Sequence, residues 1–165
     1  MFELKRLSEA GIAGALDKAE RYRLLNEPRE AESICRDVLS VDPGNQRARV
    51  DLVLSLSDQF GAEGGPSRAD VLSHIGSLEG EYEQAYYTGI IHERVAKARH
   101  TRGFPGSEHV AYDAFRQAME CFETAQALSP PGDDAALLRW NTCARLLNEH
   151  RALAPAPETG PTLLE

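Results

Sequence analysis

Residues 38–45 read Val-Leu-Ser-Val-Asp-Pro-Gly-Asn, and a similar stretch, Ala-Gln-Ala-Leu-Ser-Pro-Pro-Gly, occupies residues 125–132. Each closes an amphipathic helix with proline and glycine, which stop that helix and lead into the next one. Between such breaks, apolar residues recur three and four positions apart, and strand-like alternation is nearly absent. The sequence therefore predicts an all-α protein in which a unit of helix and turn repeats along the chain.

Seven helices are expected from these breaks. The first two run from about 8 to 26 and from 28 to the turn at 42–45. The third runs from that turn to 60, the fourth from 67 to about 78 and the fifth from about 82 to 101. The sixth covers about twenty residues from 107, and the seventh runs from 133 or 134 to beyond 147. Pro28 can open the second helix, because the first turn of a helix needs no N–H from proline.

Two serines carry signals for helix starts. Ser67 with Asp70 resembles a capping box for the fourth helix, and Ser107 is expected to cap the sixth. Gly76 and Gly80 make the fourth helix the weakest of the set. The expected domains are an N-terminal extension at 1–7, a helical repeat domain at 8–152, and a flexible tail at 153–165, where prolines and a glycine cannot sustain a helix.

The composition limits the class of protein. The chain has 165 residues, 42% of them hydrophobic, which suffices for one continuous core. No run approaches the ~20 apolar residues of a membrane span, and the charged opening lacks a signal-peptide core, so we expect a cytoplasmic protein without a membrane partner. The net charge of -8 argues against binding of nucleic acid and favours a neutral or basic partner.

No motif indicates catalysis. Cys35, Cys121 and Cys143 stand alone in apolar helical surroundings, so we expect buried, reduced thiols rather than metal or redox pairs. The helix around His92 has only one of the two histidines that a zinc-protease motif needs. A phosphate-binding glycine loop and a strained nucleophile turn are also missing from the sequence. We therefore expect a protein that is not an enzyme and has neither a metal nor a cofactor.

The residues around both breaks resemble the tetratricopeptide repeat (TPR) family. Its unit of about 34 residues has small residues where two helices cross, an aromatic late in the first helix and a closing proline. Matching positions are Ala19, Tyr22, Ala31 and Val38 before Pro43, and Ala118, Phe122 and Ala125 before Pro130. Residues 61–105 depart from the unit, so the repeats are degenerate. The resemblance implies a solenoid of three antiparallel helix pairs plus a C-terminal solvating helix.

A TPR-like solenoid implies a non-catalytic adaptor or scaffold, which binds a protein or peptide in the concave groove lined by the first helix of each pair. Carried over to this chain, the groove contains Glu20, Arg23, Arg47, Asp51, Asp58, Tyr86, Ile90, Glu93 and Arg94. This set predicts a mixed, mostly acidic groove with an aromatic floor. Two alternatives stay open: a structural module that forms a homo-oligomer through a solenoid end and, more distantly, a small-molecule-binding regulatory domain.

Overall fold

The computed structural model describes residues 2–157, and their regular secondary structure is entirely helical. The seven α-helices are α1 (Ile12–Leu24), α2 (Pro28–Val41), α3 (Gln46–Ser57), α4 (Arg68–Leu72), α5 (Glu81–Arg102), α6 (Ser107–Leu128) and α7 (Ala135–Glu149). Two short 3-10 helices, η1 (Glu9–Gly11) and η2 (Ile75–Ser77), precede α1 and follow α4. The predicted all-α class and the predicted number of helices are confirmed.

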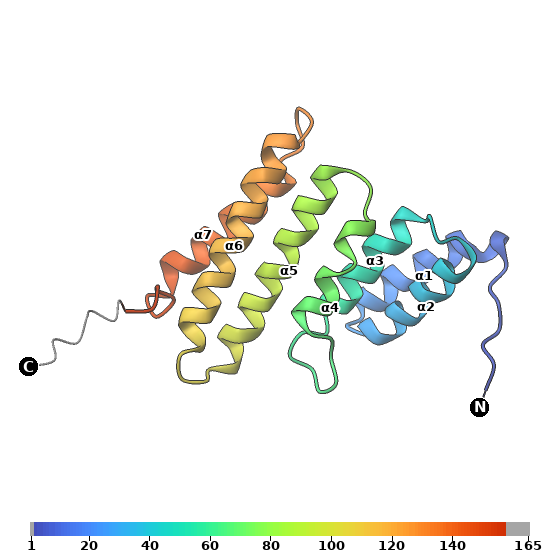
Figure 1. Ribbon diagram of the computed structural model, residues 1–165, viewed down its shortest axis with the longest axis horizontal. Coiled ribbons are helices and arrows are strands. Elements are labelled where there is room, and N and C mark those ends of the chain that lie inside the picture. Colours follow the sequence, from blue (N-terminus) through green and yellow to red (C-terminus); the bar gives the residue numbers. More distant parts are fainter. Residues whose placement is uncertain (1, 158–165) are drawn as a thin grey trace, which may run out of the picture.

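Helices that follow one another in the sequence pack side by side. The main contacts join α1 to α2, α2 to α3, α5 to α6 and α6 to α7, and the α5–α6 contact is the most extensive. Figure 1 shows the helices laid out along the long axis of the molecule, with α1 and α2 at one end and α6 and α7 at the other. None of the helices described is long and apolar enough to span a bilayer.

The buried apolar side chains form three clusters, and two of them share the flanking side chains of Ile34 and Leu39, so we treat these two together as the N-terminal core. The N-terminal core lies among α1–α4 and includes Leu16, Ala19, Cys35 and Val53. The C-terminal core lies among α5–α7 and includes Ala96, Phe115, Phe122, Cys143 and Leu153. Few side chains cross between them: Ile91 of α5 belongs to the N-terminal core, Leu54 of α3 packs on the C-terminal core, and Tyr87 packs on both. As expected, Cys35 and Cys143 are buried free thiols, while Cys121 is only partly buried.

The contact between α5 and α6 depends on a glycine. A Cβ atom at Gly89 would lie 2.5 Å from Cε1 and 2.8 Å from Cδ1 of Phe122. Carbon atoms pack at about 3.5–4.0 Å, so only glycine lets the aromatic ring approach the α5 backbone this closely.

The fourth helix is shorter than predicted. The capping box is present, since Asp70 N donates to Ser67 Oγ at 3.2 Å and Ser67 N donates to Asp70 Oδ2 at 3.0 Å. The α-helix ends at Leu72, however, and the chain continues as a turn and η2. Ser73 Oγ donates to the carbonyl of Asp70, and such serine bonds to the backbone compete with regular helix.

Ser107 is not the cap that the sequence suggested. Gly106, at φ 81°, is the N-cap of α6, and Ser107 is the first residue inside the helix. The Ser107 hydroxyl is buried and has no hydrogen-bond partner among residues 2–157. The left-handed conformation at the cap favours glycine, which explains why the helix is capped at Gly106 and not at Ser107.

The ends of the described chain differ in their packing. Residues 2–6 are exposed, and Leu7 is partly buried against the N-terminal core. At the other end, Leu153 is buried and the carbonyl of Ala154 lies 2.8 Å from His109 Nδ1, so packed chain extends past the boundary predicted at 152. Residues 158–165 of the predicted tail lie outside the described residues.

Candidate protein-binding site

The first cluster of predicted groove residues links α1 to α3. Arg47 Nη2 lies 2.9 Å from Asp17 Oδ1 and 3.2 Å from Glu20 Oε2. Its Nε lies 3.8 Å from Asp51 Oδ2, an oxygen that has no hydrogen-bond partner in the described part of the chain. Burial raises the pKa of the Asp51 carboxyl, against the lowering effect of Arg23 and Arg47. Arg47 therefore gathers the carboxylates of two helices around one cation.

The second cluster centres on Asp58 and joins three helices. Asp58 Oδ2 accepts a hydrogen bond from Arg23 Nε of α1 at 2.8 Å, and Asp58 Oδ1 lies 2.9 Å from Arg94 Nη1 of α5. Arg94 also donates to the carbonyl of Leu54 at 2.8 Å and to the hydroxyl of Ser57. Burial lowers the pKa of the Arg94 guanidinium, while Asp58 acts to raise it. A desolvated cation is thus held by charge and hydrogen bonds together.

The third cluster links α5 to α7. Glu93 is only 1% exposed, yet it accepts hydrogen bonds from Lys97 and from Arg139 Nη1, the latter at 3.3 and 3.4 Å. A buried carboxylate is tolerated when it is paired in this way. Together, the three clusters form what we call the charged face, which connects α1, α3, α5 and α7.

The aromatic part of the predicted groove is built by neighbouring tyrosines. The Tyr86 ring stacks on Tyr82 at 5.7 Å between centroids and meets Tyr87 edge-on at 5.2 Å. It also packs against Phe122 of the C-terminal core at 5.9 Å. Ile90 is only 2% exposed and belongs to that core, so it offers no surface to a partner.

Two adjoining cavities lie where α1 and α3 end. The larger has a volume of about 490 Å³ and the smaller about 240 Å³; Asn26, Pro28 and Asp58 line both. Glu20 and Arg23 line the smaller cavity as well. We call the pair the α1–α3 hollow. Asn26 shapes its rim, since its left-handed backbone, at φ 60°, ends α1 and turns the chain into α2.

The larger cavity of the hollow carries unpaired negative charge. Glu27 and Glu30 line it, and neither forms an ion pair within residues 2–157. Arg29 lines the same cavity and donates its Nη2 hydrogen to the carbonyl of Glu63 at 2.6 Å, so one cation stands beside the carboxylates of Glu27, Glu30 and Asp58. The hollow is therefore suited to receive a cationic or hydrogen-bond-donating group.

The structure places the predicted residues unevenly. Glu20, Arg23 and Asp58 line the hollow, Arg47 and Asp51 adjoin them, and Arg94 is tied to Asp58. Tyr86 is half-buried, whereas Ile90 and Glu93 are buried.

Four residues of the site were missed by sequence reasoning. They are Asp17, Glu27, Glu30 and Arg139. A signal existed for Asp17, which lies three positions before Glu20 and so on the same side of the helix. Helical spacing could not predict the role of Arg139, because its partner Glu93 lies on α5, two helices earlier in the chain.

Comparison with known proteins adds no family, so the class of this protein has to be argued from its fold and its candidate site. No protein-family model, no curated protein sequence and no solved structure matches this chain. The resemblance to the TPR family therefore stays a prediction based on the residues quoted above. Among the described residues, no group of three or more His, Cys, Asp or Glu side chains is placed to hold a metal ion.

Proposed function

We propose that this protein is a non-catalytic adaptor that binds a basic segment of a partner protein in the α1–α3 hollow. The observation that carries the proposal is that two carboxylates without ion-pair partners among the described residues, Glu27 and Glu30, line a cavity of about 490 Å³. Carboxylates in a concave surface attract Lys and Arg side chains and speed the encounter with a basic partner. The net charge of -8 acts in the same direction.

The charged face extends the proposed site beyond the hollow. Arg23, Arg47 and Arg94 are already engaged by carboxylates of the protein itself, so they preorganise the surface rather than offer free charges. Tyr82 and Tyr86 supply a partly exposed aromatic surface further along. Aromatic side chains of this kind commonly anchor a bound peptide. A cytoplasmic location is part of the proposal and is supported by the three free thiols.

Self-assembly through α7 receives less support. The exposed residues of α7 are mostly polar, namely Arg145, Asn148 and Glu149, and Leu138 is the one large apolar side chain exposed on this helix. A polar outer face suits a terminal cap better than a dimer contact. Small-molecule binding is supported only by the size of the larger cavity, since six of its eight lining residues are polar or charged.

Selection from a peptide display library tests the proposal. Peptides that bind the immobilised protein should be rich in Lys and Arg, and calorimetry should show that Glu27→Lys/Glu30→Lys weakens their binding about tenfold or more. Glu120→Lys/Glu149→Lys is the matched control, since it makes the same charge change at exposed positions on α6 and α7. Selected peptides without basic residues, or equal losses in both variants, would overturn the proposal.

A further inference from the structure

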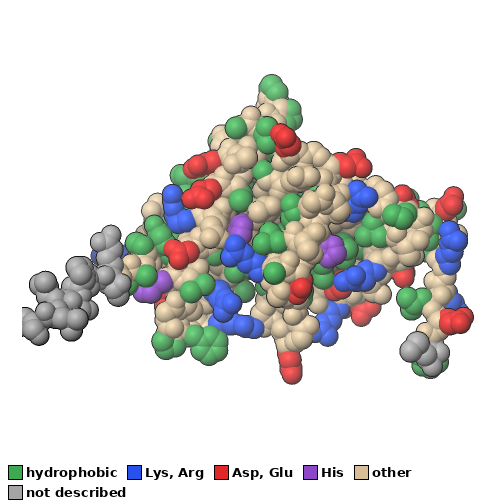
Figure 2. Space-filling model, viewed as in Figure 1, with side chains coloured by type: hydrophobic (Ala, Val, Ile, Leu, Met, Phe, Trp, Pro, Cys, Tyr) green, Lys and Arg blue, Asp and Glu red, His purple; other side chains and the backbone are tan. Residues whose placement is uncertain are grey.

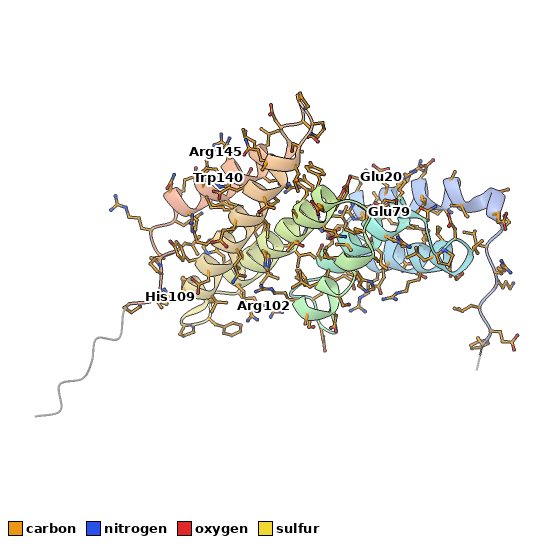
Figure 3. All side chains as sticks on the ribbon, turned by 45° about the horizontal axis from the view of Figure 1, so that its top comes forward. Glu20, Glu79, Arg102, His109, Trp140 and Arg145 are labelled. Carbon is orange, nitrogen blue, oxygen red and sulfur yellow. The ribbon has the colours of Figure 1, made fainter. Side chains whose placement is uncertain are left out.

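A separate cavity of about 200 Å³ lies between the end of α3, the start of α4 and the last turns of α5. Arg68, Arg99 and Arg102 line it, around apolar side chains of Phe60, Val95 and Ala98. We call it the arginine cavity. It shares no lining residue with the α1–α3 hollow. Figure 3 places Arg102 at the lower edge of the molecule and Glu20 of the hollow at the upper edge.

The positive charge of the arginine cavity is not neutralised by the protein. None of its lining residues is acidic. Within residues 2–157, no carboxylate comes within 4.0 Å of the guanidinium group of Arg68, Arg99 or Arg102. The nearest candidate by sequence, Asp70, is occupied by the backbone N–H and hydroxyl of Ser67. Figure 2 shows Lys and Arg side chains gathered over the lower part of α5 and the adjoining region.

The guanidinium groups retain donors for a ligand. Arg102 Nη2 donates to the carbonyl of Gly61 at 2.6 Å, and Arg68 Nη2 donates to Gln117 Oε1 at 2.7 Å. Both acceptors are neutral, and each engages one N–H, so most donors of these two groups stay free. Among the hydrogen bonds of residues 2–157, Arg68 and Arg102 of this cavity are donors and Arg99 is not. Two cations are therefore held in place and a third is uncommitted.

Helix electrostatics explain only part of this arrangement. Arg99 and Arg102 lie in the last turn of α5, where cations are favourable. Arg68 is the first residue of α4, where a cation is unfavourable, so the helix gives no reason for its charge. The charge of Arg68 also acts on His92. Burial is the main cause that lowers the pKa of His92 to about 4, and repulsion by the Arg68 cation is the second.

We propose that the arginine cavity binds a phosphate monoester or phosphate ion. A tetrahedral oxyanion can accept paired hydrogen bonds from several guanidinium forks, and arginine suits such recognition better than lysine because its donors are planar and fixed. The phosphate comes either from a phosphorylated side chain of a partner polypeptide or from free phosphate. This inference does not depend on the adaptor function, because the two sites have no residue in common.

Titration followed by NMR of the arginine Nε–Hε resonances tests the inference on the full chain. The probes are inorganic phosphate, a short phosphoserine peptide and the same peptide with unmodified serine. We expect the resonances of Arg68, Arg99 and Arg102 to shift with a phosphate-bearing probe and not with the serine peptide. Tighter binding of the phosphopeptide than of phosphate identifies a partner polypeptide as the source, whereas equal or weaker binding identifies free phosphate; both outcomes support the site.

Variants separate a built site from general attraction of anions. Arg99→Gln should weaken phosphate binding about tenfold, because it removes charge-assisted hydrogen bonds to the ligand while breaking no hydrogen bond or ion pair within residues 2–157. Arg145→Gln, at an exposed position on α7, is the matched control and should change the affinity less than about twofold. The inference is overturned if neither probe shifts the three resonances, or if both variants weaken binding equally.

Discussion

Arg94 Nη1 lies 2.9 Å from Asp58 Oδ1, so a cation of α5 and a carboxylate at the end of α3 are directly paired. Arg23 of α1 holds the other oxygen of the same carboxylate at 2.8 Å. One side chain thus bridges the helices of the N-terminal core and the first helix of the C-terminal core.

Replacing this carboxylate should destabilise the fold. Asp58→Ala should lower the free energy of unfolding by about 1–3 kcal/mol, because two partly buried guanidinium groups lose their charge partner. Urea denaturation measures the change. Glu120→Ala, at an exposed position on α6, is the control and should stay within about 0.5 kcal/mol of the wild type. An equally small effect of Asp58→Ala would mean that solvent replaces the pair without cost.

Two glycines in helices should respond in opposite ways to alanine. Gly89→Ala should destabilise by about 1–3 kcal/mol, because the new Cβ overlaps the Phe122 ring. Gly14→Ala of α1 should stabilise by up to about 1 kcal/mol, since nothing lies within 4 Å of its added Cβ and alanine favours helix. Thermal unfolding compares the two. Phe122→Leu in the Gly89→Ala background should recover part of the loss, and failure to do so would argue against the steric cause.

His92 should make stability depend on pH. Burial, followed by the charge of Arg68, lowers the pKa of His92 from its usual 6.5 to about 4. The unfolded chain therefore binds this proton at a higher pH than the folded one, and stability should fall as pH is lowered from 6.5 towards 4. Well above pH 6.5 the imidazole is neutral in both states and its contribution to the slope vanishes.

Urea denaturation at a series of pH values measures this slope. His92→Leu should flatten it between pH 6.5 and 5, where most carboxylates are still ionised. His150→Leu, at an exposed position at the end of α7, should leave the His92 contribution in place. An unchanged slope in His92→Leu would show that other groups cause the dependence.

The thiols should differ in reactivity. Burial raises the pKa of Cys35 and of Cys143 to about 12, and it also raises the pKa of Cys121, which is only partly buried. Because the thiolate is the reactive form, alkylation of the native protein should modify Cys121 first and the other two only after unfolding in urea. A mass-spectrometric time course resolves the order. Rapid native labelling of Cys143 would contradict the buried position.

The turns and most helix boundaries were predictable because short local signals determine them. Pro28 opens α2, the turn at 42–45 separates α2 from α3, and the Ser67–Asp70 capping box starts α4. The early end of α4 was harder to foresee, since the apolar spacing of Val71, Ile75 and Leu78 continues past it. There, serine side chains bond to the backbone and override the helical pattern.

The candidate site was predictable only in part. The resemblance to the TPR family placed Glu20, Arg23 and Asp58 in one groove, and in the structure these three line one hollow. Pairings across the fold cannot be read from spacing, which is why Arg139 was missed and why Ile90 was expected at the surface. The arginine cavity combines residues from three separate segments, and Arg68 lies about thirty positions before Arg99 and Arg102, so sequence spacing does not bring the three together.

The division into two hydrophobic cores bears on how the molecule opens. Local unfolding follows units that bury their own apolar surface, and here α1–α3 and α5–α7 each do so. α4 with η2 is short and about half exposed, so among the helices its amides should exchange with solvent earliest. The α5–α6 hairpin, with its extensive contact, should exchange last.

Mechanical tension applied to the two ends would therefore separate the molecule first along the seam between α3 and α5, where Leu54, Tyr87, Ile91 and Arg94 cross.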